Sequence, residues 1–230
     1  MDFYPDYYEP RPAAVSAEER SFIREHFMTY CRTHGTKLEG VEDAYLAAGE
    51  WLADVIPFYV PAYLPAKLGG AVSSGPAPPP EKSLIIYGEV GRGKTFLARK
   101  IWEFYKGVCS KYGGKVRAAF VYDTEFTLGS AIRGNGFLDE FFFGNERKIL
   151  FFDDIGNEDN SRQYGNVYSG REILRYRHIC QEKWSVPTVL TTNLTRNALA
   201  DRYGIYVESR VSGYYKGIRI RYPIDRRKGG

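Results

Sequence analysis

The chain has few cysteines, no long apolar run and no basic leader at its start. Its three cysteines, Cys31, Cys109 and Cys180, stand far apart, so neither a disulfide framework nor a zinc site with paired ligands is expected. No stretch reaches the roughly 18 apolar residues that a membrane span needs. Residues 1–10 are acidic and aromatic, unlike a secretion signal. The sequence therefore predicts a cytoplasmic protein with no membrane contact.

The composition is that of a protein with a core, and its charge is unevenly distributed. With 230 residues, 43% of them hydrophobic and 26% charged, the chain suits one α/β domain with a small extra element. The net charge is only +4, but residues 1–60 hold 5 basic and 11 acidic residues, whereas residues 196–230 hold 9 basic and 3 acidic ones. A basic end of this kind is typical either of a nucleic-acid-binding face or of a solubilising tail.

The first predicted element is a helix over residues 16–34. Ser16 and Glu19 have the spacing of a capping box, and Ile23, Phe27 and Tyr30 recur on one face. This segment is too short to bury its apolar face in a core of its own. It either docks a partner protein or packs back on the rest of the chain.

A second helical pattern runs from Val41 to Leu52, and a proline-rich stretch follows it. The prolines between residues 57 and 81, set among glycine and serine, predict a loop. We therefore divide the chain into an N-terminal helical extension, 1–36, as a possible partner adaptor, and a main α/β domain, 37–230, that carries this loop.

From residue 83 onward, strands alternate with helices. Strands are predicted over 84–87, 116–122, 149–153, 186–192 and 218–222, and the clearest helices over 94–112 and 168–184. Apolar strands that alternate with helices predict a parallel sheet sandwiched by helices, with ligands at the carboxyl ends of its strands.

A phosphate-binding loop stands at the first strand-to-helix junction. It matches the spacing G-x-x-x-x-G-K-[ST] in full and consists of Gly88, Glu89, Val90, Gly91, Arg92, Gly93, Lys94 and Thr95, with Phe96 next to it. Glycines let backbone N–H groups surround phosphates, while the lysine reaches the β- and γ-phosphates and the threonine ligates Mg²⁺. The alternative is a glycine-rich turn that matches by chance. The sequence favours a site for ATP and Mg²⁺.

Two acids end the next buried strand. Asp153 is the predicted metal-side acid, and Asp154 is placed to polarise the attacking water. A glutamate is commoner at the second position, so slow hydrolysis is expected. The other interpretation is that both acids merely cap the turn after the strand.

Two later residues complete the predicted site. Asn193 ends the strand 186–192 and would orient water or contact the γ-phosphate, unless it is a simple turn residue. Arg210 is either a solvated arginine or a finger that reaches the γ-phosphate of a neighbouring subunit.

These motifs together resemble the AAA+ ATPases of the DnaC/IstB-like family, the bacterial helicase loaders and the ATP-binding proteins of insertion-sequence transposition. The resemblance spans residues 41–222 and rests on GEVGRGKT, FFDDIGNE, REILRYR, PTVLTTN, RYG and ESR. It implies an α/β P-loop fold, a sensor role for Asn193, and a homo-oligomer in which Arg210 acts in trans. It also implies a replicative helicase or transposase and single-stranded DNA as partners.

The ends of the chain differ in how they fit this resemblance. The short stretch after Asn193 leaves no room for a C-terminal helical lid, which agrees with the loaders, whereas the small N-terminal extension departs from them. Single-stranded DNA would contact the stretch 124–143, with Arg133, Phe137 and 141–143, although phenylalanines so dense usually form core. It would also contact the basic end, whose members are Tyr214, Tyr215, Lys216, Arg219, Arg221, Arg226, Arg227 and Lys228.

The predicted function is ATP hydrolysis that switches binding to a partner and to single-stranded DNA in replication or transposition. Two alternatives remain: a P-loop kinase for a small molecule, and a nucleotide-binding scaffold with little turnover, which Asp154 keeps open. A GTPase is disfavoured because the chain has no N-K-x-D tetrapeptide.

Overall fold

Five parallel strands form one sheet in the computed structural model, which describes residues 14–69, 77–122, 125, 140–142, 144–145, 147–157 and 169–221. The strand order is β2-β3-β4-β1-β5, and every neighbouring pair is parallel. The strands are β1 (Ser83–Tyr87), β2 (Ala118–Tyr122), β3 (Ile149–Ile155), β4 (Thr188–Thr192) and β5 (Tyr215–Arg219). The predicted parallel α/β sheet is confirmed.

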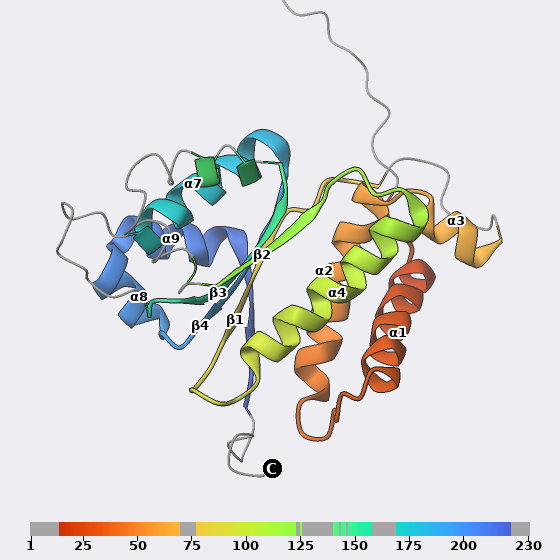
Figure 1. Cartoon of the computed structure of the whole chain (residues 1–230), viewed down its shortest axis with the longest axis horizontal. Coiled ribbons are helices and arrows are strands. Elements are labelled where there is room, and N and C mark those ends of the chain that lie inside the picture. Colours follow the sequence, from red (N-terminus) through yellow and green to blue (C-terminus); the bar gives the residue numbers. More distant parts are fainter. Residues whose placement is uncertain are drawn as a thin grey trace, which may run out of the picture.

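Helices cover both faces of this sheet (Figure 1). One face carries α1 (Ala17–Thr33), α2 (Glu42–Tyr59) and α4 (Lys94–Tyr112), and the other carries α7 (Ser169–Trp184), α8 (Arg196–Tyr203) and α9 (Ile205–Tyr214). The short α3 (Tyr63–Leu68) lies at the edge of the first layer. No helix in the described part of the chain combines the length and the apolar character needed to cross a bilayer.

Alternation along the strands creates two hydrophobic cores, one for each face. Leu84 and Ile86 of β1 pack with α1, α2 and α4, whereas Ile85 packs with α7, α8 and α9. In β3, Phe151 joins the first core and Phe152 the second. Because successive side chains of a strand point to opposite faces, a strand buried on both faces needs this unbroken apolar run.

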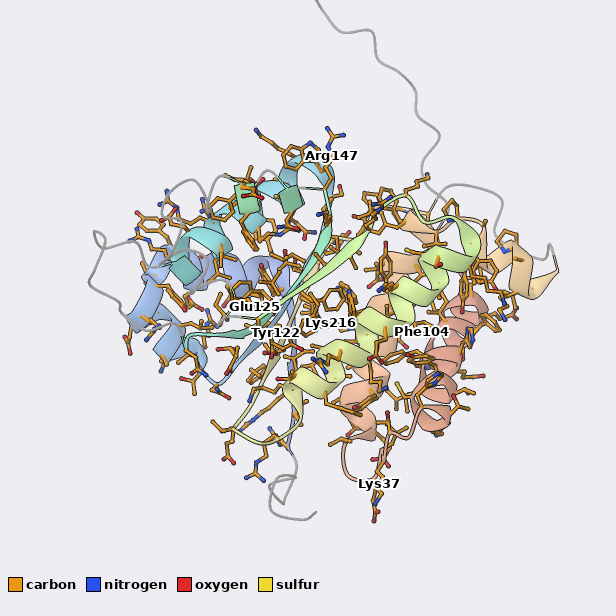
Figure 2. The ribbon with its side chains drawn as sticks, in the orientation of Figure 1. Lys37, Phe104, Tyr122, Glu125, Arg147 and Lys216 are labelled. Atoms are coloured by element: carbon orange, nitrogen blue, oxygen red, sulfur yellow. The ribbon has the colours of Figure 1, made fainter. Side chains whose placement is uncertain are left out.

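The N-terminal helix α1 is part of the first core. Ser16 and Glu19 form the predicted capping box, and Ile23 and Phe27 are completely buried. The ring of Phe104 on α4 lies 5.3 Å from that of Phe27, as centroids, and faces α1 (Figure 2). The apolar face of α1 is therefore covered by this chain, as the packing alternative predicts, while a partner-docking role for the helix stays a prediction.

The predicted loop over 57–81 is wrong for two of its parts. Helix α2 continues through Pro57 to Tyr59, and α3 contains Pro65. Pro57 lies in the last turn of α2, where the missing N–H removes a single helical bond. Burial of the following residues, Tyr59 and Tyr63, offsets that loss. Residues 70–76 lie outside the described residues.

The last strand begins three residues before the predicted one. We expect 218–222 from the apolar pattern, but β5 begins at Tyr215, which is paired with Ser83 of β1. β5 is an edge strand, so its hydrogen bonds to one neighbour decide its position and its own pattern decides little. Residues 222–230 lie outside the described residues, and the absence of a lid stays a prediction.

Candidate nucleotide-binding site

The loop between β1 and α4 depends on glycines in left-handed conformations. The φ angles of Gly88, Gly91 and Gly93 are +149°, +80° and +93°, which other residues adopt only at a cost. A Cβ atom on Gly88 would lie 2.7 Å from the carbonyl oxygen of Ile220. The local backbone thus agrees with the phosphate loop predicted from the spacing.

Lys94 opens α4 and lies folded over this loop. It is only 6% exposed, and its Nζ donates to the carbonyl oxygens of Gly88 at 2.9 Å and Glu89 at 2.8 Å. Nζ also donates to Oδ1 of Asn193 at 2.5 Å. The ammonium group therefore joins the loop after β1 to the end of β4, and it is already desolvated where phosphate oxygens are expected.

Asp153 is buried at the end of β3 beside two hydroxyl groups. Its Oδ1 accepts from Oγ1 of Thr191 at 2.6 Å. Burial raises its pKa, the nearby Asp154 carboxylate adds to this, and hydrogen bonds from Thr191 and Thr95 oppose it. A carboxylate held at this place, next to the hydroxyl of Thr95, is suited to an oxygen-liganded cation.

Asp154 occupies a strained position and is held on both carboxylate oxygens. Its φ is +66°, unusual for a residue other than glycine. Oδ1 accepts from Nδ2 of Asn193 at 2.9 Å, and Oδ2 accepts from Nδ2 of Asn157. Its N–H donates to Oγ1 of Thr191 at 2.7 Å. Backbone strain that persists under such bonding is typical of functional sites.

The strand order is what brings these residues together. β4 lies between β1 and β3, so Asn193 stands between the loop that follows β1 and the acids that end β3. The result is a continuous chain of hydrogen bonds from Lys94 through Asn193 and Asp154 to Asn157. One hydrogen bond thus joins Lys94 and Asn193, which are 99 positions apart in the sequence.

A cavity of about 760 Å³ opens over this chain of bonds. Its lining combines the phosphate loop with the ends of β2, β3 and β4: Val90, Gly91, Gly93, Lys94, Thr95, Phe96, Arg99, Tyr122, Asp154, Asn157 and Asn193. The residues present fit a nucleoside triphosphate with Mg²⁺, because a lysine, a glycine loop and a helix N-terminus suit phosphates. The hydroxyl of Thr95 and the carboxylate of Asp153 suit the cation.

Val90 and Phe96 line the cavity, whereas Glu89 and Arg92 of the loop do not. Val90 is 57% exposed, and Phe96 is also exposed, so both offer apolar surface to a ligand. Glu89 and Arg92 pair with each other outside the cavity lining, and this pairing lowers the pKa of the Glu89 carboxyl. Their predicted part in nucleotide binding therefore rests on backbone groups only.

Three lining residues were missed by the sequence analysis. Arg99 and Tyr122 belong to no motif, and Asn157 lies in FFDDIGNE but was given no role. The position of Arg99 one turn after Thr95 on α4 is the signal that would have revealed it, because residues i and i+4 share a helix face. Tyr122 ends β2 and Asn157 follows the end of β3, and these positions alone bring the two residues to the cavity.

Arg210 lies away from this cavity. It is exposed on α9 and lines a separate hollow of about 300 Å³. Three other arginines line the same hollow, namely Arg171, Arg175 and Arg202. Arg210 therefore belongs to a different surface from Lys94 and Asp153 of the same chain, as a residue that acts in trans would have to.

The described part of the basic end does not form one face. Lys216 and Arg219 occupy alternate sides of β5 by strand geometry. The ring of Tyr214 packs on His178, and burial raises the pKa of the Tyr215 hydroxyl to about 12. Arg226, Arg227 and Lys228 lie outside the described residues, so DNA binding here stays a prediction.

Most of the predicted DNA-contacting stretch 124–143 also lies outside the described residues, including Arg133, Phe137 and Phe143. Phe141 is described and buried in the second core. The ring of Phe142 lies 4.5 Å, between centroids, from that of Tyr176 on α7. These two phenylalanines pack inside, as their density predicts.

The fold of this chain is similar to that of several solved protein structures. No family model and no curated protein matches the chain, but solved structures do. A DNA replication initiation factor matches with a TM-score of 0.55 at 18% identity, over 83% of this chain and 50% of its own. A replication initiator DnaA bound to AMPPCP and single-stranded DNA matches with a TM-score of 0.55 at 16% identity, over 84% and 50%. The chain has the AAA+ fold.

A third match, to the structure of DnaI, covers more of its relative. Its TM-score is 0.51 at 21% identity, over 80% of this chain and 86% of that one. The chain thus spans most of this relative but only half of the two initiator structures. At these identities the likeness establishes the AAA+ fold, and the predicted resemblance to the helicase loaders holds at the level of that fold.

Proposed function

We propose that the chain binds ATP with Mg²⁺ in the cavity over the phosphate loop and hydrolyses it. In this proposal, ATP switches the binding of the chain to a helicase or transposase and to single-stranded DNA during replication or transposition. The observation that carries the ATP site is the bond chain that joins Lys94, Asn193 and Asp154 across three strand ends.

The residues of the proposed site have side chains suited to phosphoryl transfer. Lys94 would exchange its carbonyl partners for phosphate oxygens, while Thr95 and Asp153 would hold Mg²⁺, which neutralises charge on the β- and γ-phosphates when bound. Asn193 and Asp154 would orient the attacking water. Lys94, Thr95, Asp154 and Asn193 line one cavity, and the buried Asp153 stands next to Asp154 at the end of β3, which supports these roles.

A scaffold with little turnover is the second candidate, and Asp154 favours it. Both of its carboxylate oxygens accept hydrogen bonds from asparagines, and these bonds occupy the oxygens that would take a proton. An aspartate also reaches less far than a glutamate. We therefore expect hydrolysis to be slow without a partner or DNA.

The assembly that we propose is a homo-oligomer in which Arg210 reaches the nucleotide of a neighbouring copy. Its exposure on α9, in a hollow distinct from the nucleotide cavity, supports this role. Arg210→Ala protein should bind ATP normally and hydrolyse it poorly. Mixing it with Lys94→Ala protein should restore part of the activity, because one mixed interface pairs an intact loop with an intact arginine.

Nucleotide binding tests the core of the proposal. Lys94→Ala should lose at least on the order of a hundredfold in ATP affinity by calorimetry, since a buried charged donor to phosphate is removed. Asp153→Asn should keep nucleotide binding and lose turnover that depends on Mg²⁺. Unchanged ATP affinity in Lys94→Ala would refute the site.

Turnover measurements then separate the candidate functions. Phosphate release without any acceptor, and its stimulation by single-stranded DNA, would support the ATPase switch. Tight binding without phosphate release under either condition would support the scaffold. Product formation only with a small-molecule acceptor would instead indicate a kinase.

A further inference from the structure

The nucleotide cavity extends beyond the part that the phosphate loop accounts for. Its lining runs from the loop after β1 to Tyr122 at the end of β2. In the order β2-β3-β4-β1 these ends are three strand spacings apart, which is about 14 Å. The end near β2 is lined by Arg99, Tyr122 and Asn157, none of which belongs to the loop.

Arg99 dominates this second end of the cavity. It lies one helical turn after Thr95 on α4, so both residues face the strand ends. Its guanidinium carbon lies 5.4 Å from the centre of the Tyr122 ring and 5.9 Å from that of Phe120. These two rings alternate with Val121 on β2 and form a platform that orients the arginine.

The hydrogen-bonding capacity of Arg99 is unused within the described residues. Lys94, the other cation in the lining, already donates to two carbonyl groups and to Asn193. Arg99 has no hydrogen bond or ion pair among the residues that the structure describes.

The chemistry of this end suits an oxyanion. A guanidinium beside aromatic rings keeps a planar fork of donors that matches phosphate oxygens, unlike the point charge of a lysine. Asn157 adds an amide beside Asp154. The acids nearby exclude a free carboxylate ligand without a cation, but a phosphate that shares Mg²⁺ with Asp153 would be held from two sides.

We propose that Arg99 forms a subsite for the terminal phosphoryl group, which makes the cavity prefer a nucleoside triphosphate to a diphosphate. This inference rests on the proposed nucleotide site and adds a specificity residue to it, one that acts within the same chain. Arg99 is thus distinct from Arg210, whose hollow shares no lining residue with this cavity.

Binding of two ligands tests the subsite without any need for turnover. Calorimetry with Mg²⁺ would compare ADP with the non-hydrolysable analogue AMPPCP. Arg99→Ala should weaken the analogue by on the order of tenfold to a hundredfold and ADP by less than about twofold, as expected for a lost charge-assisted hydrogen bond. Arg99→Lys should fall in between, because it keeps the charge and loses the fork.

A matched control removes another cation from the same helix. Lys106 also lies over an aromatic ring, 4.8 Å from the centre of Trp102, but it does not line the cavity. Lys106→Ala should leave both affinities unchanged. All variants should melt within a few degrees of the parent chain, because Arg99 is exposed.

The outcomes distinguish this inference from the proposed function. If Lys94→Ala loses both ligands while Arg99→Ala changes neither, or weakens both equally, the nucleotide site stands and the subsite is refuted. Unchanged nucleotide binding with weaker binding of single-stranded DNA in Arg99→Ala would assign the arginine to nucleic acid and also refute it. If Lys94→Ala retains both ligands, the proposed function itself fails.

Discussion

The two faces of the sheet are stabilised in different ways. On the face of α1, α2 and α4, the largest buried side chains are apolar or aromatic, among them Trp51, Tyr45 and Phe27. On the face of α7, α8 and α9, the buried set includes Arg177, His178 and Gln181. The same strands therefore pack on a mainly apolar layer on one side, although Glu19 on α1 and Lys100 on α4 are also buried there, and on a more polar layer on the other.

Arg177 is the centre of the polar layer. It is 1% exposed, and burial lowers its pKa. Its guanidinium donates to Oγ1 of Thr188 at 2.7 Å and to three carbonyl oxygens, those of Asn145 at 2.8 Å, Lys148 at 2.9 Å and Pro187 at 3.3 Å. One side chain on α7 thus holds the segments that lead into β3 and β4.

The difference between the two faces bears on how the candidate nucleotide-binding site is positioned. Apolar packing is non-directional and tolerates adjustment, whereas hydrogen bonds to strand-leading carbonyls specify position. The strands held by Arg177 are those whose far ends carry Asp153, Asp154 and Asn193. The apolar face should thus contribute most of the stability, and the polar face should set the alignment of the site.

Removal of α1 should have the largest effect on this balance. A chain that starts at Lys37 loses the fully buried Ile23 and Phe27, each worth about 2–5 kcal/mol in a core. It also loses the ion pair of Arg20 with Asp54, at 2.7 Å. Since a domain of this kind has about 5–15 kcal/mol in total, we expect the truncated chain to be unfolded or aggregated by circular dichroism. An unchanged melting temperature would make α1 an independent adaptor.

A single core substitution on the apolar face should come next. Phe27→Ala should lower the free energy of unfolding by about 4 kcal/mol, because the ring is buried against Phe104 and Tyr45. Urea titration would measure this change. Phe22→Ala, at a half-buried position of the same helix, is the control and should cost clearly less. Equal losses at both positions would mean that α1 packs differently.

Arg177→Met should destabilise the polar face by about 3 kcal/mol, since three carbonyl groups and Thr188 lose their buried donor. Arg175→Met is the control, because that arginine is exposed and its one ion pair among the described residues is with Glu172, so its change should stay within about 0.5 kcal/mol. Beyond stability, Arg177→Met should also weaken nucleotide binding if the polar face aligns β3 and β4. If Arg177→Met folds and binds nucleotide as tightly as the parent chain, the polar face does not set the alignment of the site.

The smallest effects should be seen in the reactivity of thiols on the two faces. Cys31 and Cys180 are buried on α1 and α7, and Cys109 is partly exposed; none of the three, all of which lie in the described part of the chain, forms a disulfide. Burial raises the pKa of Cys31 to about 12, so at any pH below that value Cys31 has far less of the reactive thiolate than an ordinary cysteine, and its alkylation should be slow. Mass spectrometry should find Cys109 labelled first. Arg177→Met should speed labelling of Cys180 and not of Cys31.

The strongest sequence patterns predicted the fold well, and the weaker ones did not. The bounds of α4 agree with the predicted 94–112 because a glycine precedes it and another follows it, with an apolar face between. The unbroken apolar run of β3 likewise needs no tertiary information. By contrast, α8 and α9 have short apolar patterns, and Pro57 and Pro65 suggested a loop where core contacts stabilise helix. Local signals fail where tertiary packing outweighs them.

The sequence by itself determined which chemistry we propose for the candidate site: the spacing from Gly88 to Thr95 and the acids that end β3 match local backbone needs and the ligands that phosphate and Mg²⁺ prefer. Only the tertiary structure decided which residues meet. The order of the strands in the sheet cannot be predicted from hydrophobic periodicity, because any order is compatible with the same alternation of strands and helices along the chain. That order places Asn193 between Lys94 and Asp154, turns Arg99 and Tyr122 toward the same cavity, and leaves Arg210 on another surface.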